Sequence, residues 1–179
     1  AILLSTKKNL EDISLTLLTN KNIDLTILDE ENTTPLFYAS SKDNLKVVQE
    51  ILKHDCAITQ REENGEDALS MAVLNVNSII ALAIAEKWTD DFNHFYQVNK
   101  TDTTIYMRAI HFKLYKVARL IISSGKYNIG YINNLNKSSL ILAIESLDDK
   151  KIVSKEESLD EIVLSIENSV ITLENECII

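Results

Sequence analysis

The chain of 179 residues repeats a short motif at nearly constant intervals. Each copy opens on a hydroxyl or acidic residue, continues with mostly apolar residues and ends on an alanine. The copies span 34–39, 67–72, 104–109 and 139–143, and their alanines are separated by 33, 37 and 34 residues. A repeat of this length is typical of arrays in which each structural unit packs on its neighbours. The sequence therefore predicts a solenoid of stacked units.

The first copy, Thr34-Pro35-Leu36-Phe37-Tyr38-Ala39, resembles the start of an ankyrin repeat. The resemblance extends from end to end of the chain and implies an all-α repeat solenoid, in which antiparallel helix pairs are joined by short β-hairpin-like loops. Tetratricopeptide repeats are a rival helical-hairpin array, but they lack the Thr-x-Leu turn. The resemblance thus favours a single ankyrin repeat domain over residues 1–179.

The repeat spacing divides that domain into units and loops. We expect a partial unit at 1–32, then units at 33–65, 66–102, 103–137 and 138–179. The last unit carries a charged insertion, 148–157, which we expect to be a surface loop between its two helices. Both ends of the chain look cut, so we expect a fragment of a longer array. Hairpin segments are predicted near 23–34, 57–67, 96–104 and 129–138.

Apolar spacing predicts the second helix of two units. Val47, Val48 and Ile51 share one helical face, as do Val117 and Ile121 in the later unit. The segment Asp43-Asn44 comes immediately before the earlier of these helices and supplies side-chain acceptors for its N-cap. We therefore expect a capped helix after residue 44.

Residues typical of catalytic or metal sites are scattered. The three histidines lie in different units, and no glycine-rich phosphate loop is present. His54-Asp55-Cys56 contains the residue types of a thiol triad, but sequential neighbours in a turn point in different directions. The cysteines Cys56 and Cys177 are far apart, which favours a reducing compartment. We expect no enzyme activity, no cofactor and no metal.

The charge suggests a partner class. The net charge is −9, of which residues 148–179 contribute −6 through nine acids and three lysines. Negative charge repels phosphate, so nucleic acid and anionic membranes are poor partners and a basic protein surface is a better one. Acidic runs also serve simply to keep proteins soluble. The hairpin tips carry acids that fit either interpretation: Asp29, Glu30, Glu31, Glu62 and Glu63.

The resemblance also implies a binding surface, since ankyrin proteins commonly grip partners with hairpin tips and the exposed side of each first helix. The matching positions stand one residue before the motif alanine and two or three after it. An alternative is that some of them turn inward, because degenerate repeats can shift the phase of a helix. The candidates are Tyr38, Ser41, Lys42, Met71, Leu74, Asn75, Arg108, His111, Phe112 and Leu142, followed by Glu145 and Ser146.

The sequence thus predicts a non-catalytic protein–protein interaction module that binds a protein through a concave groove and the hairpin tips. The alternative is a targeting or substrate-recruiting arm of a larger enzyme or ubiquitin-ligase adaptor. We expect a monomer without membrane insertion. We also expect an intracellular, cytoplasmic location, in the cell of origin or in a host cell.

Overall fold

The computed structural model describes residues 1–98, 101–139, 141 and 142. The chain divides into two compact units, Ala1–Asp90 and Asp91–Ile179. Each unit is described by itself below. Residues 145–157, which contain two groove candidates and the expected insertion, lie outside the described residues.

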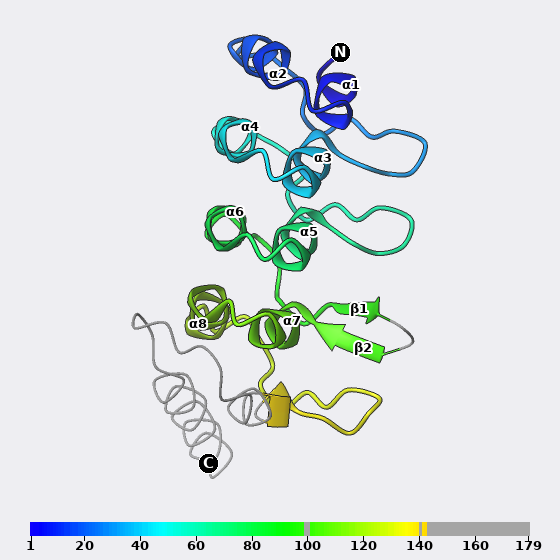
Figure 1. The fold of residues 1–179 in the computed structure, drawn as a ribbon, viewed down its shortest axis with the longest axis vertical. Helices are drawn as coiled ribbons and strands as arrows, with labels where there is room; N and C mark the ends of the chain where they lie inside the picture. The colour runs from blue at the N-terminus through cyan, green and yellow to red at the C-terminus, as the bar shows by residue number, and fades with distance from the viewer. Residues whose placement is uncertain (99–100, 140, 143–179) are drawn as a thin grey trace. The chain divides into compact units, whose positions relative to one another are not determined.

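Unit 1 stacks three helix pairs (Figure 1). The first helices form one layer, with α1 against α3 and α3 against α5, and the second helices form another, with α2 against α4 and α4 against α6. The predicted array of antiparallel helix pairs is therefore confirmed within this unit. The helices are α1 Ile2–Lys7, α2 Glu11–Leu18, α3 Pro35–Ser41, α4 Leu45–Ile51, α5 Ala68–Leu74 and α6 Ser78–Ala85.

Side-chain caps define where α3, α4, α5 and α6 begin. The Thr34 hydroxyl accepts a hydrogen bond from the Phe37 amide, and Pro35 occupies the first turn of α3, where no donor is lost. Asp67 forms a reciprocal capping box with Ser70 at α5. Asn44 accepts from the Val47 amide, so the predicted cap of α4 is confirmed.

The core of unit 1 lies between the two helix layers. The motif alanines Ala39 and Ala72 are 2% and 0% exposed, and their small side chains let the first helices approach closely. From the second helices, Val48 and Ile51 are both fully buried. The motif alanines are therefore packing residues.

Loops connect the pairs at one edge of unit 1 (Figure 1). In place of a regular ladder they contain single bridges, one between Leu25 and Cys56 and one between Arg61 and Asp67. Asn32 and Gly65 occupy equivalent tip positions with φ of 59° and 84°. These tips match two of the predicted hairpin segments.

Unit 2 contains a regular hairpin followed by a helix pair. The antiparallel strands β1 Phe95–Val98 and β2 Thr101–Thr104 pair in the register Phe95↔Thr104. They lead into α7 Ile105–His111 and α8 Tyr115–Ser123. A bridge between Ile132 and Ser138 closes the next tip. Both hairpins match predicted segments, so the all-α repeat class with short hairpin loops is confirmed.

No helix among the described residues is long and apolar enough to cross a bilayer.

Candidate protein-binding surface

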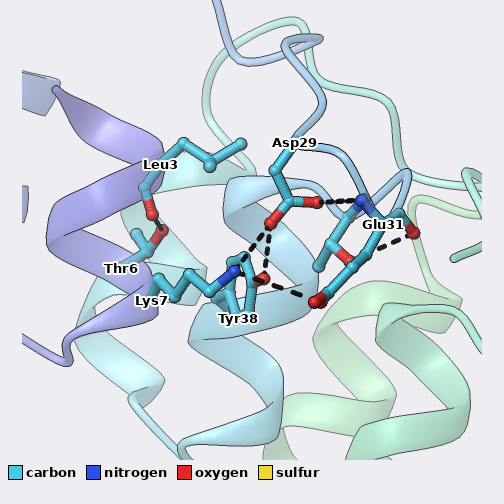
Figure 2. Close-up of polar contacts among 7 residues, drawn as sticks. Leu3, Thr6, Lys7, Asp29, Glu31 and Tyr38 are labelled. Atoms are coloured by element: carbon cyan, nitrogen blue, oxygen red, sulfur yellow. Dashed lines mark hydrogen bonds and ion pairs between the residues drawn. The ribbon is translucent and has the colours of Figure 1, made fainter.

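A polar cluster links the first hairpin tip to two helices of unit 1 (Figure 2). The Tyr38 hydroxyl on α3 donates to Asp29 Oδ2 over 2.6 Å, and Lys7 Nζ on α1 lies 3.1 Å from the same oxygen. Lys7 Nζ also lies 5.1 Å from the centre of the Tyr38 ring and 4.0 Å from Glu31. The cluster therefore holds the tip against α1 and α3.

Asp29 also orders the backbone of its own tip. Its Oδ1 accepts from the amides of Glu31 and Thr33 at 3.1 and 3.0 Å. Burial alone would raise the pKa of the Asp29 carboxyl, but hydrogen bonds from Tyr38, Thr33, Lys7 and Glu31 outweigh it and hold that pKa well below its usual range. Burial raises the pKa of the Tyr38 hydroxyl, and its hydrogen bond to Asp29 raises that pKa further. The charged Asp29 carboxylate thus has a structural role in this tip.

Tyr38 was expected to be exposed in the groove, and this expectation is wrong. Its side chain is 8% exposed, because the ring lies under Lys7 and the hydroxyl is bound by Asp29. The alternative, that some candidates turn inward, holds here. Tyr38 braces the fold and offers little surface to a partner.

Arg108 in unit 2 was also expected to be exposed in the groove, and this expectation is wrong. The residue is 3% exposed. Its Nε donates to Thr103 Oγ1 over 3.2 Å and its guanidinium lies 4.4 Å from the centre of the Tyr96 ring. Arg108 therefore braces α7 against the β1–β2 hairpin, as Tyr38 braces α3 against its own tip.

Glu62 plays a local structural part in the second tip. Its Oε1 accepts from the Glu66 amide, and its carbonyl accepts from the Gly65 amide. The two tips are also joined to each other, because the Glu63 amide donates to the Glu31 carbonyl over 3.1 Å. The exposed acids of this edge are Glu30, Glu31 and Glu63.

The candidates on α3 and α5 divide into exposed and tied side chains. Met71 and Leu74 are partly exposed, and Lys42 is exposed. Asn75 is exposed too, yet its Nδ2 donates to the Ser41 carbonyl and to Asp43 Oδ1, which ties α5 to the turn after α3. Met71, Leu74 and Lys42 are therefore the available contact residues of this face.

In unit 2, the remaining candidates lie at the end of α7 and beyond it. His111 is exposed and its ring meets that of Phe112 edge to face, with centres 5.0 Å apart. Phe112 and Leu142 are partly buried. These three keep surface that a partner could contact.

Three equivalent positions on α1 and at its C-cap were missed. Subtracting the 34-residue period from Tyr38, Ser41 and Lys42 gives Leu4, Lys7 and Lys8, all of which are exposed. The motif gave no signal for them, because residues 1–3 do not contain a Thr-Pro-Leu segment. The period alone could have found them.

The rest of unit 1 offers little chemistry. An open cleft of about 570 Å³ lies where α2 and α4 end, and His54 and Asp55 are among the residues that line it. Among the described residues, no group of three His, Cys, Asp or Glu side chains is arranged to hold a metal. Burial raises the pKa of the Cys56 thiol, which disfavours the reactive thiolate.

A family model for ankyrin repeats in three copies matches residues 2–96, and the match agrees with the stacked pairs of unit 1. This chain belongs to the ankyrin repeat family. Ankyrin repeats are generally protein–protein interaction modules, and they are typically non-catalytic.

Known ankyrin repeat proteins match this chain at low identity. The chain is 29% identical over 105 residues to putative ankyrin repeat protein L371 of Acanthamoeba polyphaga mimivirus, across 56% of this chain but 13% of that relative's length. A crystal structure of EF0377, an ankyrin repeat protein, matches 94% of this chain and 80% of its own with a TM-score of 0.70 and 16% identity.

A further match is to the structure of the predatory endopeptidase Bd0816 from Bdellovibrio bacteriovorus in complex with immunity protein Bd3460. It covers 94% of this chain and 93% of that chain, with a TM-score of 0.68 and 22% identity. At these identities the structural likenesses establish the fold alone.

Proposed function

We propose that this ankyrin repeat chain is a non-catalytic module that binds a protein through its first-helix face and hairpin tips. The proposal rests on two observed features of unit 1, the acidic edge of its hairpin tips and the partly exposed apolar residues on α5. Glu30, Glu31 and Glu63 stand exposed on two tips that share a hydrogen bond, while Met71 and Leu74 offer apolar surface on α5.

This arrangement suits a partner with a basic rim around an apolar contact. Complementary charge accelerates encounter and selects the partner, whereas buried apolar anchors supply most of the affinity. Met71 belongs to a residue type that is enriched at interfaces. The basic nature of the partner and its identity as a protein both belong to the proposal.

The test uses two variants of the full chain in pull-downs from lysate of the source cell. Met71→Ala with Leu74→Ala should reduce capture by removing the apolar anchors, at a cost of about 2 kcal/mol or more if they form a hot spot. Replacing Glu30, Glu31 and Glu63 together by lysine should abolish capture of a basic partner.

The matched control is Ile79→Ala, because Ile79 is an exposed apolar residue on α6, away from the first-helix layer. Tyr38→Ala is unsuitable, since loss of the Asp29 contact would disturb the fold. Thermal melts followed by Trp88 fluorescence verify that each variant is folded. If both variants fold and still capture the partner, the proposed surface is wrong.

A further inference from the structure

In unit 2, the β1–β2 hairpin lies beside the loop that follows α8 (Figure 1). The rings of Phe95 and Tyr131 stack with their centres 4.3 Å apart and an angle of 29° between their planes. The side-chain oxygen of Asn134 accepts a hydrogen bond from the Asp102 amide over 3.2 Å, which joins the two loops at a second point. Phe95 is nevertheless 49% exposed, so part of this aromatic pair faces solvent.

Strand alternation places an acid on the same side of the hairpin as Phe95. Residues opposite each other in an antiparallel pair point to one face, and neighbours along a strand point to opposite faces. Tyr96 lies opposite Thr103 in the register. Phe95 and Asp102 therefore share the other face. Burial raises the pKa of the Tyr131 hydroxyl and the negative charge of Asp102 raises it further, as expected for a charge close to the aromatic pair.

The opposite face of this hairpin already binds a guanidinium from within the chain. The guanidinium carbon of Arg108 lies 4.4 Å from the centre of the Tyr96 ring, and Arg108 Nε donates to Thr103 Oγ1. A ring from β1 and an oxygen from β2 thus hold one arginine. The face with Phe95 and Asp102 offers the same two kinds of group, and its oxygens belong to a carboxylate.

We propose that this face of the hairpin, defined as Phe95, Asp102 and Tyr131 and called the aromatic–acid edge, binds an arginine side chain of a partner protein. The guanidinium stacks on the exposed part of the aromatic pair and forms an ion pair with Asp102. Arginine fits better than lysine, because its planar, weakly hydrated group stacks on a ring while its N–H groups bind a carboxylate. Ile132 and Leu135, in the same loop as Tyr131, are 56% and 59% exposed and offer apolar surface to the arginine stem.

This inference rests on the proposed function, since it names one side chain of the protein partner and a contact for it in unit 2. The surface is a different one, because the apolar anchors Met71 and Leu74 and the exposed acids Glu30, Glu31 and Glu63 all belong to unit 1. Loss of either surface can therefore be measured without the other.

The test titrates the isotope-labelled full chain with the peptide Gly-Gly-Arg-Gly-Gly and follows the ring resonances of Phe95 and Tyr131 by NMR. Two matched peptides carry citrulline, which keeps the planar shape without the charge, or lysine, which keeps the charge without the plane. The arginine peptide should shift both rings. It should bind about fivefold more tightly than the citrulline peptide, as expected for an exposed cation–π contact, and more tightly than the lysine peptide.

Three variants assign the contact to the aromatic–acid edge. Phe95→Leu keeps an apolar side chain without the ring, and Asp102→Asn keeps the side-chain shape without the charge. Each should weaken arginine binding by about fivefold, whereas Phe95→Trp should retain it. Glu30→Gln is the matched control, since it removes an equal charge from unit 1, and it should leave binding unchanged. Circular dichroism verifies that each variant is folded.

Several results would overturn the proposal. Absence of ring shifts, or equal binding of the arginine and citrulline peptides, would remove the cation from the contact. Equal binding of the lysine peptide would mean that a point charge is sufficient. Binding that survives in both Phe95→Leu and Asp102→Asn would place the arginine elsewhere on the chain. A dimer of the parent chain that Phe95→Leu dissociates would assign the edge to a second copy. None of these results depends on Met71, Leu74 or the acidic tips of unit 1.

Discussion

At the scale of single residues, the turn between the two helices of each pair requires one residue in the left-handed region. Asn9, Asp43, Val76 and Lys113 occupy this position with φ between 52° and 59°. Asparagine and aspartate tolerate that conformation, whereas a β-branched residue such as valine is an outlier there. Val76 is therefore a point of backbone strain in unit 1.

We predict that Val76→Asn stabilises unit 1 by about 1 kcal/mol, because asparagine relieves part of the left-handed penalty of roughly 1–2 kcal/mol. Val76 is 51% exposed, so little buried apolar area is lost. Urea unfolding followed by Trp88 fluorescence measures the change. Ile79→Asn serves as control, since it also replaces an exposed β-branched residue but lies within α6. An equal gain in both variants would mean that it comes from replacing an exposed apolar side chain by a polar one and not from relief of backbone strain.

The residue before the motif alanine shows where sequence reasoning fails. The same repeat position holds Leu4, Tyr38, Met71 and Arg108, and the period locates all of them. Tyr38 and Arg108 nevertheless turn to their own hairpins, because Asp29 and Thr103 offer them hydrogen-bond partners. Periodicity gives the position of a side chain on its helix, but the identity of a polar partner depends on the folded loop.

At the scale of elements, each described tip uses a polar residue at its start to bind its own backbone. Asp29 accepts from the amides of Glu31 and Thr33, and Asn133 accepts from those of Leu135 and Lys137. The residues stand at the same repeat position. Asparagine can do this without charge, so the charge of Asp29 serves its contacts with Tyr38 and Lys7.

We predict that Asp29→Asn lowers the free energy of unfolding by roughly 1–2 kcal/mol at pH 7, since bonds to a charged group are lost while the tip geometry is kept. The pKa of Asp29 is lowered in the folded state. Its contribution is therefore present above the unfolded pKa of about 3.9 and is lost as the pH falls further, through the folded value.

Urea titrations at pH 7 and at pH 2.5 check this prediction. The gap between parent and variant should shrink at the lower pH, where Asp29 in the unfolded chain is protonated. Glu30→Gln, on the exposed side of the same tip, should follow the parent at both values. A gap for Asp29→Asn that is unchanged by acid would contradict a role for the charge.

The elements themselves were largely predictable. Helix pairs, the cap at Asn44 and the hairpin segments follow from the repeat period, the apolar spacing and local side-chain chemistry, all of which act over a few residues. The contribution of the tips to a binding edge was less predictable, because the side chains of Asp29 and Glu62 bind the backbone of their own loops. Charge in a sequence does not distinguish an acid that faces solvent from one that orders a turn.

At the scale of the whole molecule, the contribution of a side chain to stability depends on its place in the stack. A core residue in a repeat array is buried by the pairs on both sides. Ile51 lies on the middle pair of unit 1 and is fully buried, whereas Leu17 holds the equivalent position on the first pair and is partly exposed. One substitution at two equivalent positions can therefore measure what a neighbouring pair contributes.

We predict that Ile51→Ala destabilises unit 1 by about 2–5 kcal/mol, since it leaves a cavity between two layers that cannot close without moving both. Leu17→Ala should cost about 1–2 kcal/mol, because part of that side chain is already in water and the site is free to relax. Both are measured by urea unfolding with Trp88 fluorescence, and replacing each by alanine keeps the helix propensity of the variants equal. Equal losses would mean that the first pair is as well packed as the middle one. A larger loss at Ile51 would show that stability in unit 1 is built by stacking, one pair upon the next.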